Sequence, residues 1–319
     1  MKILLIKKLS YLSIMLFIIA VISFLAVNLA PNSFFASGEL NPNITEESIE
    51  QLKAIYNLDK PLYIQFYAWL TNIIQLDFGI SFSTGEHVKT EILNRLPITL
   101  IINITSMVFI FALSMYLGIK AARNQNSWFD KFVKQLSILS FSMPSFYLAL
   151  LLIYFFSINL ELFPLTGTNS DASLTGFAYV SDLAWHLTLP IAVIIFGGIG
   201  SLSLYVRSLT LEILKSDYIF FAKTRGLSEY EILRYYILPN LYPTIVTILG
   251  LSLPGILGGS VILENIFAID GMGLLFFQAA LSHDYPVIMG ILIIGAFLTL
   301  LGNIIADLIL LKLNPNIKA

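Results

Sequence analysis

The chain has no cysteine, little charge and a very apolar composition. The absence of Cys among its 319 residues excludes disulfides, thiolate metal sites and cysteine nucleophiles. Charged residues make up 12% of the chain, hydrophobic residues make up 57%, and the mean hydropathy is +0.83. A soluble domain of this size is far more polar, so the composition predicts an integral membrane protein.

Motifs that carry catalytic chemistry are also missing. The chain contains no G-x-x-x-x-G-K-[ST] sequence, so it has no P-loop of its own to bind ATP. It has no H-E-x-x-H, and His87, His186 and His283 fall at or beside predicted outer loops without metal-ligand spacing. Ser260 lacks the flanking glycine of a nucleophile elbow and is interpreted as a packing residue. These absences disfavour a membrane-embedded enzyme.

Six runs without a charged residue are each long enough to cross a bilayer as a helix. They cover residues 9–30, 96–119, 136–160, 187–206, 241–263 and 285–306. Continuous apolar character of this length argues against β-barrel strands, which alternate weakly over about ten residues. The predicted fold is an all-α integral membrane protein with six transmembrane helices.

Basic residues indicate how these helices are oriented. If both termini are cytoplasmic, only four of the 18 Lys and Arg residues lie outside, namely Lys53, Lys60, Lys89 and Arg95. The segment 161–186 has three carboxylates and no Lys or Arg, which places it on the outer face. The expected organisation is a cytoplasmic N-terminus and first helix at 1–30, an extracytoplasmic helical loop at 31–95, a five-helix core at 96–311 containing a cytoplasmic loop at 207–240, and a cytoplasmic tail at 312–319.

The outer loop is expected to contain two helices. Thr45, followed by two glutamates, is typical of a helix N-cap and predicts a helix through about Tyr56. A second helix is predicted from Pro61 through Trp69. These helices either cover the outer end of the bundle or contact a substrate-delivery protein, and both interpretations stay open.

The polar segment 216–240, called the elbow below, separates the fourth and fifth apolar runs. Its first half predicts a short helix with Lys223 and Arg225 in the last turn, where cations interact favourably with the helix dipole. Gly226 follows, and glycine readily adopts the positive φ angle that ends a helix. We therefore expect the first helix to stop at Gly226.

The second half of the elbow predicts another helix. Ser228 and Glu231 have the S-x-x-E spacing of a capping box, which starts a helix. The helix is expected to run to Leu238 and to be closed by Pro239. Two short helices that meet at a rigid corner suit docking to a partner protein.

The elbow resembles the cytoplasmic EAA loop of permease subunits of binding-protein-dependent ABC importers, in particular their dipeptide, oligopeptide and nickel branch. The matching residues follow the branch pattern D-Y-x-x-x-A-(K/R)-x-(K/R)-G-L with a closing L-P, and they are Asp217, Tyr218, Ala222, Lys223, Arg225, Gly226, Leu227, Leu238 and Pro239. The wider pattern has Glu and Ala where this chain has Phe220 and Phe221, and Ile where it has Tyr236.

Other blocks extend this resemblance over nearly the whole chain. They include LDKP, QFYAWL, LDFGIS, NRLPITL, SMPSFYLALLLIYFFS, LTLP, ENIF and DGMG. The resemblance implies a multi-pass protein of the bacterial cytoplasmic (inner) membrane, surrounded by lipid. It also implies a second homologous permease subunit, two ATP-binding subunits and an extracytoplasmic substrate-binding protein as partners, and no nucleic acid.

The implied division of labour leaves this chain without catalysis, cofactor or metal. ATP and Mg would bind to the partner ATPase, and the matching elbow residues would sit in a groove of that ATPase. The favoured cargo is a dipeptide or oligopeptide, and nickel or a metal chelate is the alternative. A receptor would not require the elbow, and an ion channel would be expected to show a filter-like loop.

Acidic and basic residues at the ends of the apolar runs have two interpretations each. Glu264 follows the fifth run and either lines an outer vestibule or gate, or is bonded to backbone amides at a helix end. Asp307 and Arg207 lie at predicted inner boundaries, where they either form an ion pair or reach the water by snorkelling.

Small residues and prolines predict how the helices pack. Gly255 with Gly259, and Gly197 with Ser201, have small-x-x-x-small spacing and are expected to support tight packing within the chain. Bends are expected in three helices, at Pro144, Pro190 and Pro254.

Overall fold

The computed structural model describes residues 2–29, 60–171, 173–252 and 261–313. This part of the chain is mostly helical, with one isolated antiparallel bridge between Ile80 and His87. The chain divides into two compact units. Unit 1 comprises Met1–Thr99, Leu257–Val261 and Asp270–Leu301, and unit 2 comprises Leu100–Ile256, Ile262–Ile269 and Gly302–Ala319.

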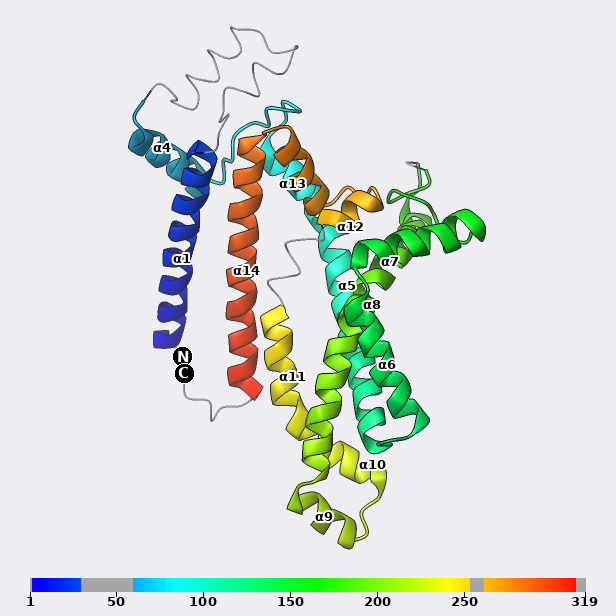
Figure 1. Cartoon of the computed structure of the whole chain (residues 1–319). Coiled ribbons are helices and arrows are strands. Elements are labelled where there is room, and N and C mark those ends of the chain that lie inside the picture. The colour runs from blue at the N-terminus through cyan, green and yellow to red at the C-terminus, as the bar shows by residue number, and fades with distance from the viewer. Residues whose placement is uncertain (1, 30–59, 172, 253–260, 314–319) are drawn as a thin grey trace. The chain divides into compact units, whose positions relative to one another are not determined.

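Unit 1 is built from long helices and shorter ones (Figure 1). It contains α1 (Lys2–Leu29), α4 (Leu62–Ile74), the beginning of α5 (Val88–Arg123), α13 (Met272–Leu281) and most of α14 (Tyr285–Leu313). Its hydrophobic core includes Ala20, Ile92, Leu275 and Val287. Gly290 lets α14 approach α5, because a Cβ atom there would lie only 2.8 Å from Val88.

Unit 2 contains the remainder of α5 and the elbow. Its other elements are α6 (Trp128–Ser142), α7 (Ser145–Leu152), the π-helix η1 (Ile153–Asn159), α8 (Gly176–Leu214), α9 (Asp217–Thr224), α10 (Glu229–Ile232), the π-helix η2 (Leu233–Ile237), α11 (Leu238–Ser252) and nearly all of α12 (Val261–Ile266). Three glycines bring these helices together. A Cβ on Gly118 would lie 2.7 Å from Val206, one on Gly198 would lie 2.6 Å from Ile110, and one on Gly200 would lie 2.7 Å from Ser140.

Gly197 has a different environment from its neighbours. A Cβ atom added to it would meet no atom of the described residues within 4 Å. The expectation of tight internal packing at Gly197 was therefore wrong, because the helical rotation points Gly198 and Gly200 at other helices instead. Gly255 and Gly259 lie outside the described residues.

In the described part of the chain, four helices are long and apolar enough to cross a membrane: residues 7–26 of α1, all of α5 and α8, and residues 285–305 of α14. The third apolar run instead covers two helices, α6 and the α7–η1 segment, which meet at 102°. Pro144 lies at this break and precedes α7, where its missing N–H breaks no helical hydrogen bond. The bend expected at Pro144 is thus confirmed, whereas Pro190 lies inside α8 without ending it.

The fifth apolar run is only partly described. It covers residues 241–252 of α11 and 261–263 of α12, but residues 253–260, including Pro254, lie outside the described part of the chain. The helix predicted from Thr45 to Tyr56 is outside it as well. The helix predicted after Pro61 is confirmed as α4, and the side-chain amide of Gln65 donates a hydrogen bond to the Lys60 carbonyl at 2.7 Å.

Two long helices begin before their apolar runs. α5 starts at Val88 rather than at residue 96, and α8 starts at Gly176, so the loop expected at 161–186 ends at Thr175. Charged residues fit into the first turns of α5 because they form ion pairs. Arg95 lies 2.6 Å from Asp270 and 3.4 Å from Glu91.

Two blocks of the sequence that lie far apart meet at this ion pair within unit 1. Arg95 and Thr99 belong to NRLPITL, and Asp270 and Met272 belong to DGMG. Besides the Arg95–Asp270 contact, the backbone N–H of Met272 donates to the Thr99 hydroxyl at 2.8 Å. These contacts fix the start of α13 against α5.

Candidate functional site

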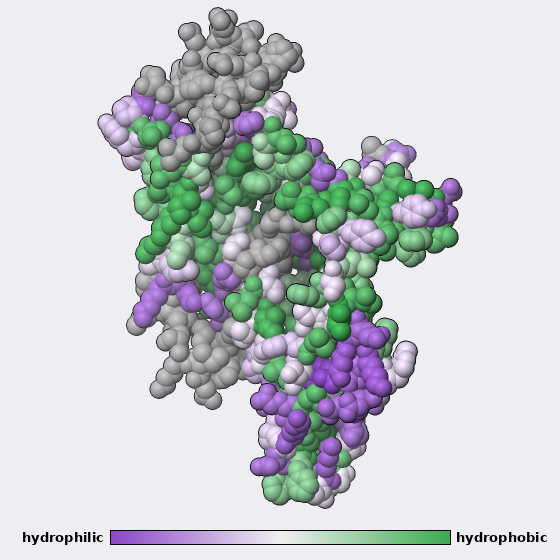
Figure 2. All heavy atoms as spheres, in the orientation of Figure 1, coloured by the Kyte–Doolittle hydropathy of each residue, from purple (hydrophilic) through white to green (hydrophobic). Residues whose placement is uncertain are grey.

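The elbow joins α8 to α11 and carries the helices α9 and α10 (Figure 1). Hydrophilic residues gather on the surface at this end of unit 2 (Figure 2). Four basic residues of the elbow region have exposed side chains, namely Lys215, Lys223, Arg225 and Arg234. This polar end is the candidate surface for a partner protein.

The first helix of the elbow ends as the sequence predicts. Lys223 lies in the last turn of α9, Arg225 is the C-cap residue, and Gly226 has a φ angle of +78°. The N–H of Gly226 donates to the Lys223 carbonyl at 2.9 Å, and the N–H of Leu227 donates to the Ala222 carbonyl at 3.2 Å. This pair of hydrogen bonds is a Schellman motif, which satisfies carbonyls at the helix end and fixes the corner.

The predicted capping box at the start of the second helix is also confirmed. The backbone N–H of Glu231 donates to the Ser228 hydroxyl at 3.2 Å, and the backbone N–H of Ser228 donates to the Glu231 carboxylate at 2.7 Å. The hydroxyl and N–H of Ser228 hold the pKa of Glu231 below its ordinary value by hydrogen bonding to the ionised form. Each end of the elbow corner is therefore fixed by local hydrogen bonds.

Pro239 does not close the second helix, contrary to the sequence-based expectation. The chain continues from α10 through η2 into α11, and Pro239 lies in the first turn of α11. The π-helical turns explain this continuity. In η2 the N–H of Leu238 bonds to the carbonyl of Leu233, five residues back, so the α-helical pattern restarts at Leu238 and Pro239 lies in its first turn, where a proline is tolerated.

The inner face of the elbow belongs to the hydrophobic core of unit 2. Ile219 and Ala222 of α9 are buried in one cluster with Ile119 of α5, Val206 of α8 and Leu241 of α11. A larger side chain than alanine at position 222 would have to displace these close-packed neighbours. Ala222 thus holds the elbow against the long helices.

The outer face of the elbow is aromatic and cationic. Phe220 is 65% exposed and Phe221 is 62% exposed. Tyr218 stacks on Tyr236 with ring centroids 6.3 Å apart and an interplanar angle of 15°. The three residues that differ from the wider family pattern therefore lie in two environments. Phe220 and Phe221 are exposed on the surface, and Tyr236 packs η2 against α9.

The remaining predicted site residues lie on or near this outer face. Asp217 is exposed in the first turn of α9, where a carboxylate favours the helix dipole. Leu227 is half-buried beside the core, and Pro239 is exposed. The structure thus brings all the predicted elbow residues into one compact element, with Ala222 inside and the charged residues outside.

Two ion pairs that the sequence does not reveal join helices of unit 2, and the first of them holds the elbow. Arg123, at the end of α5, pairs with Glu229, the first residue of α10. The hydrogen bond from Arg123 lowers the pKa of Glu229 below its ordinary value. The elbow is therefore tied electrostatically to the end of a helix long enough to span the membrane.

The second ion pair joins α6 to α8. Arg207 contacts the fully buried Asp130 carboxylate through two nitrogens at 2.5 and 2.9 Å. Lys134 adds a contact at 3.0 Å, and the backbone N–H of Asn126 donates to Asp130 at 2.9 Å. Arg207 therefore does not extend as an unpaired cation to water. The S-x-x-D spacing of Ser127 and Asp130 is a helix-start signal that points to α6, but it does not identify the partner.

Glu264 lies in α12 and is buried. Its carbonyl accepts a hydrogen bond from the Ile269 N–H at 2.8 Å, which helps to close the loop after α12. Its role at a vestibule or gate stays a prediction.

Two family models of binding-protein-dependent transport systems match this chain, one over its N-terminal third and one over most of the remainder. Residues 112–319 match the family described as "Binding-protein-dependent transport system inner membrane component". Residues 1–103 match the family described as "Binding-prot-dependent transport system membrane comp, N-term". The first match covers more than half of the chain.

Individual relatives are similar over almost their full length. The chain is 34% identical over 301 residues to the oligopeptide transport system permease protein AppB of Bacillus subtilis (strain 168), covering 94% of each protein. It is 30% identical over 313 residues to the dipeptide transport system permease protein DppB of Lactococcus lactis subsp. cremoris (strain MG1363), covering 98% of each.

The fold is similar to that of a chain from inward-facing conformations of the MetNI methionine ABC transporter. The TM-score is 0.57 at 18% identity, and the match covers 70% of this chain and 96% of that chain. At this identity the likeness concerns the fold.

Proposed function

This chain belongs to the family of binding-protein-dependent transport system inner membrane components, and on this premise we propose that it is a permease subunit of an ABC importer that moves dipeptides or oligopeptides into the cell. The long similarity to oligopeptide and dipeptide permeases supports the choice of peptides over nickel or a metal chelate. The apolar helices make the chain a multi-pass membrane protein.

The structure of the elbow is the observation that carries this proposal. Its inner face is packed into the core of unit 2, and its outer face presents Phe220, Phe221 and Arg225. Exposed aromatic rings and an arginine are the side chains enriched in protein interfaces. A groove lined by apolar and acidic residues on an ATPase subunit would complement this face.

In the proposed mechanism the ATPase moves the elbow as one body. The Schellman motif, the capping box and the tyrosine stack keep α9 and α10 in a fixed relation. The buried inner face and the Arg123–Glu229 pair then pass the displacement to α5, α8 and α11. ATP drives the cycle only if it binds the inward-facing and outward-facing arrangements with different affinity.

The proposal assigns the remaining tasks to partners. A second homologous permease subunit completes the membrane pathway, two ATPase subunits bind ATP and Mg, and an extracytoplasmic binding protein delivers the peptide. The elbow lies on the cytoplasmic side together with both termini, in agreement with the excess of Lys and Arg expected there.

Reconstitution into proteoliposomes tests the proposal. The complete transporter, with ATP enclosed at the ATPase side and the binding protein supplied outside, should accumulate a radiolabelled tripeptide in the lumen. Uptake should require ATP and should be competed by unlabelled peptides but not by nickel. Nickel uptake without peptide uptake would contradict the peptide assignment. Purified alone, this chain should hydrolyse no ATP above background.

A further inference from the structure

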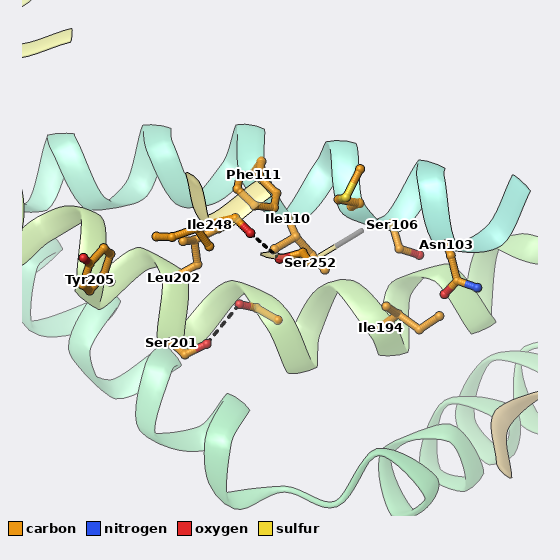
Figure 3. Close-up of a pocket in the computed structure, with 12 residues that line it drawn as sticks. Asn103, Ser106, Ile110, Phe111, Ile194, Ser201, Leu202, Tyr205, Ile248 and Ser252 are labelled. Carbon is orange, nitrogen blue, oxygen red and sulfur yellow. Dashed lines mark hydrogen bonds between the residues drawn. The ribbon is translucent and has the colours of Figure 1, made fainter. Parts of the chain in front are cut away.

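A cavity of about 520 Å³ lies within unit 2, between α5, α8 and α11 (Figure 3). Its volume falls in the range of sites that bind small molecules, roughly 300 to 1,000 Å³. The walls are mainly aliphatic and aromatic, and five polar side chains interrupt them: Asn103, Ser106, Ser201, Tyr205 and Ser252. None of the described residues that line the cavity carries a formal charge at neutral pH.

Ser106 is the residue of this lining whose buried side-chain hydroxyl lacks a hydrogen-bond partner in the described part of the chain. It is 1% exposed, and its hydroxyl has no hydrogen-bond partner there. By contrast, the hydroxyl of Ser252 donates to the Ile248 carbonyl at 2.8 Å. Figure 3 shows Ser106 and Asn103 projecting from α5 toward α8, into the space between the helices. A buried hydroxyl without a partner is unfavourable, and a ligand with a polar group at this place would satisfy it.

We propose that this cavity binds an uncharged interior segment of the transported peptide, with the Ser106 hydroxyl bonded to a peptide amide and an apolar side chain against the aliphatic wall. The inference rests on the proposed function and deepens it, because it places peptide recognition inside this permease subunit. A peptide group has an N–H donor and a carbonyl acceptor. The Ser106 hydroxyl can accept a hydrogen bond from the first or donate one to the second.

The absence of charge in the lining sets the specificity of the site. A lysine or glutamate side chain that entered the cavity would lose its hydration without gaining a partner of opposite charge. The site should therefore prefer a peptide with an apolar central residue over one with a charged central residue. It should also accept the middle of a peptide rather than its ionised ends.

Photo-cross-linking locates the peptide directly. The tripeptide alanyl-photoleucyl-alanine is added to the purified transporter complex in nanodiscs, in the absence of the binding protein, and adducts on this chain are mapped by mass spectrometry. Adducts are expected within residues 103–111, 194–205 or 248–252. Competition by Ala-Leu-Ala should be at least about ten-fold stronger than competition by Ala-Lys-Ala, as expected for the cost of burying an unpaired charge.

Filling the cavity provides the matched comparison. Ser201→Phe places a large ring at the wall of the cavity, whereas Ser208→Phe makes the same change at an exposed position of α8 outside the lining. Ser201→Phe should abolish the adducts and Ser208→Phe should leave them unchanged. Adducts that persist in Ser201→Phe, or that fall outside the lining, would overturn the inference.

Ser106→Ala separates a ligand contact from a structural role. Because the hydroxyl has no partner among the described residues, its removal should leave the thermal unfolding temperature unchanged or slightly higher. The affinity for the tripeptide, measured from the concentration dependence of cross-linking, should fall about five-fold, which is the effect of one lost hydrogen bond. A lower unfolding temperature with unchanged affinity would contradict the assignment.

Two further outcomes are distinguishable. If the wild-type complex imports peptides but yields no adducts in the lining, the inference fails and the proposed function stands. If it imports no peptide at all, the proposed function fails. Efficient labelling of the lining by a photoactivatable phospholipid that the tripeptide does not displace would identify a lipid site and overturn the inference.

Discussion

Arg123 at the end of α5 pairs with Glu229 at the start of α10. The contact connects the polar elbow with a helix that is long and apolar enough to cross the membrane. The side chain of Arg123 is 28% exposed and that of Glu229 is 73% exposed. The pair therefore contributes little to the free energy of unfolding. We expect its main effect to be on the transmission of movement from the elbow to α5.

The first prediction concerns this pair. Arg123→Gln and Glu229→Gln should each change the free energy of unfolding by no more than about 1 kcal/mol, because solvent screens an exposed ion pair. Both variants should nevertheless hydrolyse more ATP per peptide imported, since the elbow is less firmly tied to α5. The exchange Arg123→Glu with Glu229→Arg should restore the ratio. Unchanged coupling in both single variants would refute the transmitting role.

The pH dependence of the pair follows from the direction of the pKa shift. Folding lowers the pKa of Glu229, mainly through the hydrogen bond from Arg123, so the pair stabilises the elbow above the ordinary pKa of Glu. This stabilisation is lost as the pH falls through the lower, folded value. Between about pH 6 and 8 the hydrogen exchange of α10 should therefore show no change attributable to Glu229.

The second prediction concerns Asp130 and Arg207, whose side chains are 0% and 13% exposed. Asp130→Ala should lower the free energy of unfolding by about 3 to 5 kcal/mol, because it leaves the Arg207 charge buried without its partner. Thermal unfolding of the purified chain in detergent measures the change. The double variant Asp130→Leu with Arg207→Met removes both charges and should be markedly more stable than Asp130→Ala. An equal loss of unfolding free energy in Asp130→Ala and in the double variant would contradict this prediction. It would show that the packing contacts of α6, rather than the uncompensated Arg207 charge, determine the loss.

The third prediction tests the orientation. The chain is naturally free of Cys, so single cysteines can be introduced at exposed positions, Thr166→Cys before α8 and Gln125→Cys between α5 and α6. A membrane-impermeant thiol reagent should label position 166 in intact cells, and position 125 only after permeabilisation. The unmodified chain serves as the unlabelled control. The reverse pattern would place the elbow outside the cell and contradict the proposed docking.

Local signals predicted the elbow well because they act within a few residues. The positive φ of Gly226 and the capping box of Ser228 and Glu231 depend on hydrogen bonds over three to five positions, and both are confirmed. Pro239 misled the prediction because a π-helical turn from Leu233 precedes it and places it in the first turn of α11, where a proline is tolerated. The sequence carries no comparably simple signal for that turn.

Contacts between distant residues were the part that the sequence did not reveal. Arg95 meets Asp270, and Arg207 meets Asp130, across separations that no periodic pattern encodes. Hydropathy predicted the run at 136–160 but not its 102° bend, which arises at Pro144. Hydropathy also placed the starts of α5 and α8 too late, because paired polar residues, such as Arg95 with Glu91 in α5 and His186 with Asp182 in α8, join a helix beyond its apolar stretch.

Gly226 offers the sharpest test of the elbow, because the backbone conformation at this position restricts the residue type while the space around it does not. A Cβ atom at this position would meet nothing within 4 Å among residues 2–29, 60–171, 173–252 and 261–313, so it has no steric clash with them. The φ angle of +78° is the constraint. Gly226→Val forces a β-branched residue into that conformation at a cost of about 1 to 3 kcal/mol, whereas Asn adopts it more readily.

The most direct measurement is ATP-dependent peptide uptake by proteoliposomes that contain the complete transporter with either Gly226→Val or Gly226→Asn. Both variants should reach the membrane in normal amounts, because the strain falls in the elbow and not among the apolar helices. Gly226→Val should lose most of its uptake, through loss of the ATPase or hydrolysis without transport, and Gly226→Asn should retain most of it. Normal uptake by Gly226→Val at normal abundance would contradict the claim that the elbow couples the ATPase to peptide movement.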